Sequence, residues 1–370
     1  MALDSIGGGT NSNSSFSGKI AVITNLPFQT QNDEEFWSGE QALSKYGPNN
    51  IIHLTWPAFF VQEKEQVDAV ISTLSVNSDI KALVINQAVP GCNTAVEKLR
   101  KYRDDIFVVY CLPHENLTVS AGCANLIFMP NEFGVGASIV KQARKQGAKT
   151  FVHYTFPRHM AIKFYAACRD MMRETCKAEG IVFVDATAID PMGETGNYSA
   201  EQFIVEDVPR MVDRYGENTA FYSTNCFLQV PLIRSVVENH AIFPQPCCPS
   251  PYHGFPEALG IETGEGIPDL NYVISETSRI AAAKNMTGRL SSWPVPLTMM
   301  FTNAGVEYAI KWIKGEVSKT GIDDKVLSEC MIAYIKESSG RTLDVNLTSH
   351  TENDKVYKSV KMLLMNYLNY

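Results

Sequence analysis

The sequence predicts a two-lobed α/β protein in which each lobe is a doubly wound parallel sheet, with additional helices in the C-terminal part of the chain. Three observations predict this fold. Short apolar runs alternate with amphipathic stretches, a pattern typical of βαβ units. The pattern restarts near residue 130, which indicates a second block of the same architecture. The chain has 370 residues, more than one domain core usually needs and enough for two.

Four regions follow from this pattern. Residues 1–18 form an expected flexible tether rich in Gly, Ser and Asn. Residues 19–129 form the first lobe, to which part of 257–370 is expected to return. Residues 130–256 form the second lobe. The remaining stretch, 257–370, is predicted to supply the crossover and helices that pack on both lobes.

The first block contains five predicted strands, each a short run rich in β-branched or aromatic residues. They cover residues 19–24, 51–54, 82–86, 106–111 and 125–129. The stretches between them have helical spacing of apolar residues, which predicts helices over 33–46, 62–76 and 93–102.

The second block repeats this order of elements. Strands are predicted at 150–154, 181–186, 219–224 and 241–243, and helices at 136–146, 157–179, 200–215 and 230–239. The helix over 157–179 has Pro157 in its first turn and Gly180 at its C-terminal end, both favourable positions for these residues.

Beyond Pro244 the pattern becomes helical. A connector rich in Pro and Cys, residues 244–256, leads to helices around 270–287 and 302–319. The tail, residues 323–370, is predicted to contain two more amphipathic helices.

Composition excludes several classes. No run of 18 or more apolar residues is present, so no transmembrane helix is expected. The net charge of −8 disfavours a phosphate backbone, so no direct binding of nucleic acid is expected. The nine cysteines include no CxxC pair, so neither a metal nor another cofactor is predicted.

The compartment has two interpretations. The cysteine usage and the lack of a signal peptide in the chain as written predict a cytoplasmic protein. The alternative is an exported lipoprotein whose signal segment is missing from this chain, because a Gly/Ser/Asn tether often follows a lipid anchor.

A ligand of an open parallel sheet binds beyond the carboxyl ends of the strands. That rule selects polar and aromatic residues at or after the strand ends of both blocks. The predicted ligand-binding residues are Thr24, Asn25, Trp56, Gln87 and His114 in the first lobe and Tyr154, Arg158, His159, Thr224 and Asn225 in the second.

Arg158 and His159 carry the most specific prediction. They open a predicted long helix, where free N–H groups and the helix dipole already favour negative charge. Cations at that end become favourable when an anion binds there, so we expect the two residues to hold an anionic group of the ligand. The alternative is an internal ion pair of Arg158 with Asp185 or Asp190.

Two groups of residues are of types that bind metals but also have simpler interpretations. His114 and Glu115 are expected to form a polar loop, although the pair could bind a metal. Cys247, Cys248 and His253 could also bind a metal, but the two cysteines are expected to pack in a connector made rigid by prolines.

An enzymatic alternative rests on two cysteines. Residues 92–95, CNTA, resemble a motif of amino-acid racemases, and Cys226 precedes PLIRSV much as the second racemase cysteine precedes its apolar run. This similarity implies a cofactor-independent racemase or isomerase that uses Cys92 and Cys226 as a proton-transfer pair. Three departures count against it. Residues 88–91 intervene between the strand and Cys92, and the His of the second motif is absent, since Phe227 follows Cys226. The run DSIGGG at 4–9, which resembles a third racemase motif, precedes the first predicted strand instead of following it.

Three long stretches carry a family resemblance: FVHYTFPRHM at 151–160, YGENTAFYSTNC at 215–226 and CCPSPYHGFPEALG at 247–260. Through them, residues 19–304 resemble an uncharacterised bacterial family of type I periplasmic-binding-protein-like proteins. That fold is shared with basic-membrane-protein lipoproteins and with the sensor domains of sugar- and purine-responsive transcriptional regulators.

The resemblance implies a cleft between two lobes and a small-molecule-binding role, as a solute receptor or ligand sensor without enzymatic activity. It also implies a transporter or a regulatory protein as partner. Only 18 residues precede Lys19, too few for a DNA-binding domain in this chain. The ligand and the oligomeric state are left open.

Overall fold

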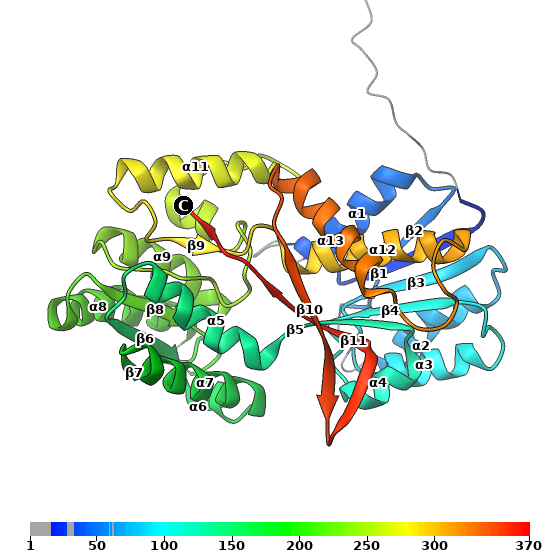
Figure 1. Cartoon of the computed structure of the whole chain (residues 1–370), viewed down its shortest axis with the longest axis horizontal. Coiled ribbons are helices and arrows are strands. Elements are labelled where there is room, and N and C mark those ends of the chain that lie inside the picture. Colours follow the sequence, from blue (N-terminus) through cyan, green and yellow to red (C-terminus); the bar gives the residue numbers. More distant parts are fainter. Residues whose placement is uncertain (1–15, 28–32, 59, 61–62, 195) are drawn as a thin grey trace, which may run out of the picture.

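Two sheets of mainly parallel strands, one in each lobe, organise the protein (Figure 1). The computed structural model describes residues 16–27, 33–58, 60, 63–194 and 196–370. The larger sheet has seven strands in the order β10-β11-β5-β4-β3-β1-β2, and the smaller has three in the order β7-β6-β8. The two-block α/β architecture predicted from the sequence is therefore confirmed.

The first lobe is built on five parallel strands. These are β1 (Lys19–Thr24), β2 (Ile51–Thr55), β3 (Ile80–Asn86), β4 (Phe107–Cys111) and β5 (Leu126–Pro130). The helices between them are α1 (Glu34–Tyr46), α2 (Lys64–Ser75), α3 (Cys92–Arg100) and α4 (Leu117–Cys123). All five residues of β4 are buried because helices cover both faces of the sheet, which explains the continuous apolar runs in the sequence.

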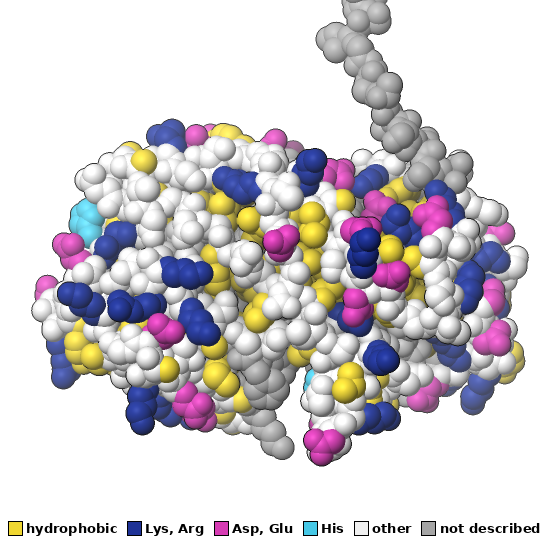
Figure 2. Space-filling view, viewed as in Figure 1, with side chains coloured by type: hydrophobic (Ala, Val, Ile, Leu, Met, Phe, Trp, Pro, Cys, Tyr) yellow, Lys and Arg dark blue, Asp and Glu magenta, His cyan; other side chains and the backbone are white. Residues whose placement is uncertain are grey.

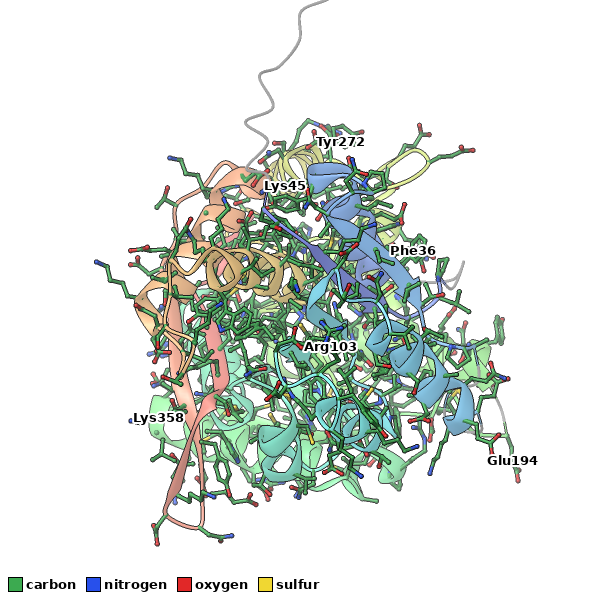
Figure 3. All side chains as sticks on the ribbon, turned by 90° about the vertical axis from the view of Figure 1, so that its right-hand side faces the viewer. Phe36, Lys45, Arg103, Glu194, Tyr272 and Lys358 are labelled. Atoms are coloured by element: carbon green, nitrogen blue, oxygen red, sulfur yellow. The ribbon has the colours of Figure 1, made fainter. Side chains whose placement is uncertain are left out.

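Two later helices complete this lobe. They are α12 (Leu297–Lys314) and α13 (Asp324–Ser339), and α12 crosses the face of β3 and β4 (Figure 1). A Cβ atom added at Gly305 would lie 3.2 Å from a methyl group of Val109, so glycine permits this close approach. Lys45 of α1, labelled in Figure 3, forms ion pairs with Glu307 and Glu337 that tie the three helices together.

The tail differs from the prediction of two helices over 323–370. Only α13 is helical, and the chain then forms a hairpin of β10 (Val345–Glu352) and β11 (Lys355–Met365). Strand β11 pairs in parallel with β5, so the apolar run near the C-terminus fills a place in the first sheet. Asn353 and Asp354 both adopt positive φ, as a two-residue hairpin turn requires. This Asn-Asp pair was the sequence signal that the helical interpretation overlooked.

The second lobe contains β6 (Thr150–Thr155), β7 (Val182–Thr187) and β8 (Thr219–Ser223). Its helices are α5 (Glu132–Lys145), α6 (Pro157–Met160), α7 (Lys163–Glu179), α8 (Gly196–Tyr215), α9 (Gln229–Glu238), α10 (Phe255–Leu259) and α11 (Leu270–Ala283). A short antiparallel pair, β9 (Ser291–Ser292) and β12 (Leu368–Asn369), lies beside them. The predicted strand at 241–243 makes isolated bridges only.

The single long helix predicted over 157–179 is broken. Helix α6 ends at Met160, and α7 begins at Lys163 after Ile162 takes an extended conformation with φ −88° and ψ 118°. Arg158 and His159 therefore lie in a helix of one turn, which has little of the dipole that the prediction relied on.

Within the described residues the chain passes between the lobes near 130–132, 293–297 and 365–368. Figure 2 shows basic and acidic side chains interspersed over both lobes on the face in view. No helix in the described part of the chain is both long enough and apolar enough to span a bilayer.

Candidate functional site

A cavity of about 450 Å³ lies between the two lobes. Its lining comes from the carboxyl ends of the strands in both sheets, from α1 and α7, from the Pro- and Cys-rich connector and from the segment that leads into α12. Lining residues used below are Glu34, Glu35, Gln87, His153, Tyr165, Cys168, Tyr222, Thr224, Cys226, Cys247, Cys248, His253 and Thr298.

Glu35 is the centre of the first-lobe wall. Its two carboxylate oxygens accept hydrogen bonds from the side-chain amides of Asn25, at 2.6 Å, and Gln87, at 2.7 Å. The other amide atom of Gln87 contacts a ring nitrogen of His114. Burial raises the pKa of Glu35, although the two amide hydrogen bonds oppose that shift. Two residues predicted from strand ends, Asn25 and Gln87, thus bind a carboxylate that the prediction did not include, and the predicted His114 contacts Gln87.

Glu34 connects this wall to the connector. Its Oε1 accepts a hydrogen bond of 2.6 Å from the hydroxyl of Ser250, and its Oε2 accepts one of 3.4 Å from Thr298. Burial raises the pKa of Glu34 to about 7, because a carboxylate loses its hydration in this position. Glu34 therefore takes up a proton near neutral pH.

Two histidines of the second lobe have hydrogen-bonding partners: His153, which lines the cavity, and His159, which does not. A ring nitrogen of His159 lies 2.9 Å from the hydroxyl of Thr224, and His153 Nδ1 lies 3.2 Å from a carboxylate oxygen of Asp185. Burial is the main cause that lowers the pKa of each imidazole. Both rings are therefore held neutral, which suits hydrogen bonding to a polar ligand or to the protein itself.

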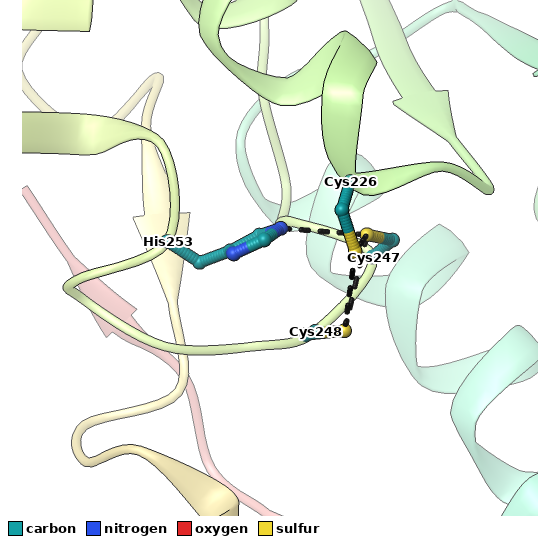
Figure 4. A group of neighbouring side chains, drawn as sticks. All are labelled: Cys226, Cys247, Cys248 and His253. Atoms are coloured by element: carbon teal, nitrogen blue, oxygen red, sulfur yellow. Dashed lines mark hydrogen bonds between the residues drawn. The ribbon is translucent and has the colours of Figure 1, made fainter. Parts of the chain in front are cut away.

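Three thiols and an imidazole form a cluster on the second-lobe wall of the cavity: Cys226, Cys247, Cys248 and His253 (Figure 4). Their Sγ and ring-nitrogen atoms all lie within 4.8 Å of one another. Hydrogen bonds from the two neighbouring thiols lower the pKa of Cys226, and the pKa values of Cys247 and Cys248 rise in turn. Cys226 is therefore the most acidic of the three thiols.

Local structure explains why these four residues meet. Cys226 begins a 3₁₀ turn directly after β8, and the side chain of Asn225 caps that turn by accepting from Phe227 N–H. The buried Gln229 donates to the carbonyl of Asn225 and accepts from the backbone N–H of Cys247. This amide therefore holds the connector against the end of β8.

From the sequence, Cys247 and Cys248 were expected to pack within a rigid connector, and no metal was predicted. Their spacing contained no CxxC signal because Cys226 comes from a strand end 21 residues earlier. Only the fold brings it beside the connector, together with His253.

Several predicted site residues have structural partners and do not line the cavity. Trp56 is buried and donates its indole N–H to the carbonyl of Gln87 at 2.8 Å. Thr24 is buried against a ring nitrogen of His53. Asn225 caps the turn described above. These three support wall residues from behind.

Tyr154 was predicted as a ligand-binding residue, but its side chain points the other way. It is fully buried, stacks on Phe221 and donates its hydroxyl hydrogen to Asp207 at 2.8 Å. Successive side chains of a strand face opposite sides, so the cavity is lined by the preceding residue, His153. Strand-end position alone could not decide between the two.

Arg158 forms the internal pair that the sequence analysis kept as the alternative. Its Nε and Nη2 donate to the two carboxylate oxygens of Asp190 at 2.7 and 2.8 Å. The guanidinium is about half exposed, and Arg158 does not line the cavity. His159 lies behind Thr224. The expected anion-holding pair at a long helix is therefore replaced by an ion pair at a single turn.

Cys92 does not face Cys226 across the cleft. Its side chain is fully buried in the first-lobe core at the start of α3, and burial raises the pKa of its thiol. Only Cys226 of this pair lines the cavity. The two-cysteine racemase alternative requires both thiols to face one cleft, and Cys92 instead packs among core residues of the first lobe.

Four lining residues were not predicted from the sequence: Glu34, Glu35, His153 and Tyr165. Adjacent acidic residues in the first turn of the helix after β1 were the available signal for the first two. Nothing in the sequence marks His153 or Tyr165, because their orientation depends on strand register and on the break before α7.

Comparison with known proteins agrees with this architecture. A family model described as "Protein of unknown function (DUF3798)" matches residues 18–291. An uncharacterized protein of Treponema pallidum (strain Nichols) is 30% identical over 165 residues, which are 45% of this chain and 76% of that protein.

Two crystal structures show the same fold at low identity. A candidate transcriptional regulator from Clostridium difficile 630 aligns with a TM-score of 0.84 at 20% identity, over 96% of this chain and 100% of that one. A sugar ABC transporter protein from Actinomyces odontolyticus ATCC 17982 aligns with a TM-score of 0.54 at 12% identity, over 84% and 86%. This chain thus has the two-lobed type I periplasmic-binding-protein-like fold, and it belongs to the family described as "Protein of unknown function (DUF3798)".

Proposed function

We propose that this protein binds a small polar molecule in the cavity between its lobes and releases it unchanged. The observation that carries the proposal is the cavity of about 450 Å³ lined from both sheets. Ligand pockets of proteins span roughly 300–1,000 Å³ and combine an apolar lining with a few oriented polar groups. Here Glu35, Gln87 and Thr224 are such groups.

The lining favours a neutral or cationic ligand over the anion expected from Arg158 and His159. Among the described residues that line the cavity are two carboxyl groups, Glu34 and Glu35, and four cysteines, but no Lys or Arg. An anion would have to enter beside these carboxyl groups without a Lys or Arg partner, which is costly in a cavity of low polarity. Polyols, sugars and small amines fit this chemistry.

We further propose that a partner protein detects the bound state. The structurally similar proteins include a sugar ABC transporter protein and a candidate transcriptional regulator, so delivery to a transporter and control of a regulator are the two outputs in view. For either output, the lobes would close around the ligand and change the surface that the partner contacts.

All nine cysteines are free thiols, which is consistent with a protein that functions in a reducing compartment.

The test is a thermal-shift screen followed by calorimetry with three panels of ligands: neutral polyols and sugars, small amines, and carboxylates or sugar phosphates. A ligand at about 100 times its dissociation constant should add about 2.7 kcal/mol of stability. We expect hits in the first two panels. Hits confined to the anionic panel would contradict the proposed ligand class, and no saturable binding in any panel would contradict the proposed function.

A pair of variants locates the site. Gln87→Leu removes both polar groups that hold Glu35 and His114, so it should weaken binding of a hit by more than about tenfold. Gln66→Leu makes the same change on the exposed face of α2 and should leave the affinity unchanged. Equal affinities for the two variants would place the ligand elsewhere.

A further inference from the structure

The cluster of Cys226, Cys247, Cys248 and His253 has the dimensions of a metal site. The Sγ atom of Cys226 lies 3.5 Å from that of Cys247 and 3.8 Å from that of Cys248. The sulfurs of Cys247 and Cys248 are 4.0 Å apart, and His253 Nε2 lies 3.5 Å from Cys247 Sγ. Figure 4 shows the four side chains converging from two segments of the chain.

These spacings match a tetrahedral zinc centre. With metal–sulfur bonds of about 2.3 Å and metal–nitrogen bonds of about 2.0 Å, a tetrahedron separates two sulfurs by about 3.8 Å and a sulfur from a nitrogen by about 3.5 Å. A disulfide, by contrast, needs sulfurs about 2.05 Å apart. All four of these separations lie near the tetrahedral values.

The ligands are also held in place by the surrounding backbone. Gln229 is fully buried and bonds both the turn after Cys226 and the backbone N–H of Cys247. On the His253 side, Ser250 accepts from the backbone N–H of His253 and donates its hydroxyl hydrogen to Glu34. The ligand atoms are therefore positioned before an ion arrives, which reduces the ordering cost of binding.

The environment suits a soft cation. A group of three thiols and an imidazole can release its protons to a thiophilic divalent ion, and three thiolates with a neutral imidazole offset the ion's charge. Cys248 is the exposed member of the four and gives the ion a route from the cavity. Three cysteines and one histidine fill all four positions of the tetrahedron, as in structural zinc sites.

We propose that Cys226, Cys247, Cys248 and His253 bind one zinc ion in a tetrahedral site on the wall of the cavity. The ion would join the connector to the end of β8 and so fix the second-lobe wall. The site does not depend on the proposed ligand, because its four protein ligands complete the coordination without a fifth group.

The test uses the full chain purified under reducing, anaerobic conditions. Metal content is measured by mass spectrometry, and Zn²⁺ and Co²⁺ are then titrated into protein stripped with a chelator. We expect one equivalent of either ion per chain. With Co²⁺, the ligand-field bands of a tetrahedral complex and a thiolate-to-cobalt charge-transfer band should appear together.

Variants assign the ligands. Cys226→Ser, Cys247→Ser and His253→Gln should each weaken Co²⁺ binding by more than about tenfold and reduce or shift the charge-transfer band. Cys168→Ser is the matched control, since Cys168 lines the same cavity but lies outside the cluster. It should bind Co²⁺ as the unmodified chain does. Far-ultraviolet circular dichroism of each chelated variant shows whether it remains folded.

Three results would overturn the proposal. One is a fully reduced, folded chain that binds neither ion. Another is a cobalt spectrum without thiolate charge transfer, and the third is an unchanged affinity in the Cys226→Ser and His253→Gln variants. If the reduced chain takes up no metal, and two cysteines of the cluster form a disulfide reversibly on oxidation, the cluster would be a redox pair instead. The calorimetric ligand screen is repeated on chelated protein, because ligand binding without metal tests the proposed function independently of this site.

Discussion

The hydroxyl of Ser250 donates a hydrogen bond of 2.6 Å to Oε1 of Glu34, and this contact joins the connector of the second lobe to α1 of the first. Both residues are buried. Because Ser250 lies between the cysteine pair and His253, the contact also links the first-lobe wall of the cavity to the thiol cluster. Protonation of Glu34 is therefore expected to affect how firmly the two lobes are held together.

Glu34 should make stability depend on pH. Burial raises its pKa from the usual 4.5 to about 7, so the folded chain retains a proton that the unfolded chain has lost. Between these pH values unfolding releases a proton, and the free energy of unfolding falls as pH rises. The contribution of Glu34 is present below about pH 4.5 and has been lost above about pH 7, a difference on the order of 3 kcal/mol.

Glu34→Gln should remove this dependence. The free energy of unfolding is measured by urea titration of chelated, reduced protein. As pH rises from 5 to 8, the value for the variant should increase relative to that for the unmodified chain by on the order of 3 kcal/mol. Glu65→Gln changes an exposed residue in the first turn of α2 and serves as the control. If the free energies of unfolding of the Glu34→Gln and unmodified chains differ by a constant amount from pH 5 to pH 8, Glu34 does not titrate as the structure indicates.

Tyr154 should matter for stability and not for ligand binding. Tyr154→Phe removes the hydrogen bond to the buried Asp207, and loss of a buried bond to a charged group costs about 1.5–3 kcal/mol. Tyr198→Phe, at an exposed position on α8, should change the free energy of unfolding by no more than about 0.5 kcal/mol. Chemical unfolding measures both. A Tyr154→Phe variant with full stability but lost ligand affinity would restore Tyr154 as a contact residue.

Thiol labelling should separate Cys92 from Cys226. In native, reduced and chelated protein, the exposed Cys248 and the low-pKa Cys226 should react with an alkylating reagent well before Cys92, whose thiol is fully buried. Peptide mass spectrometry after timed quenching gives the order. Equal labelling rates for Cys92 and Cys226 would show that Cys92 reaches solvent, as the racemase alternative requires.

Gly39 should be required for the position of α1. A Cβ atom there would overlap the imidazole of His53, which is held between Thr24 and Glu40. Gly39→Ala is therefore expected to destabilise the fold by on the order of 1–3 kcal/mol and to weaken ligand binding, since α1 carries Glu34 and Glu35.

The matched control is Gly122→Ala in α4, where a Cβ atom meets nothing within 4 Å. This change should be neutral or stabilising by up to about 1 kcal/mol, because alanine is the better helix former. Both variants are compared by thermal unfolding. Equal stability of the two would mean that His53 moves aside without cost.

The local sequence patterns were sufficient for most elements of the two sheets. Buried parallel strands such as β4 are continuous apolar runs, and Gly180 ends α7 in a left-handed conformation as its position predicted. The same patterns placed Asn25, Gln87 and Thr224 near the site, because the carboxyl ends of parallel strands share one edge. These features depend on residues close together in the chain.

Other features depended on contacts between distant residues. The run that ends β11 was compatible with a helix until the edge of β5 offered it a partner. Which of His153 and Tyr154 faces the cavity was decided by the register of β6 between β7 and β8.

The thiol cluster shows the same division. The sequence alone determined that cysteines follow β8 and occupy a rigid connector, and it contained no spacing that identifies a metal site. Only the tertiary structure decided that Cys226 and Cys247 meet at 3.5 Å, with Cys248 and His253 beside them. A site assembled from two segments has no local signature, because its geometry is set by the packing of the connector against the sheet and not by residue spacing.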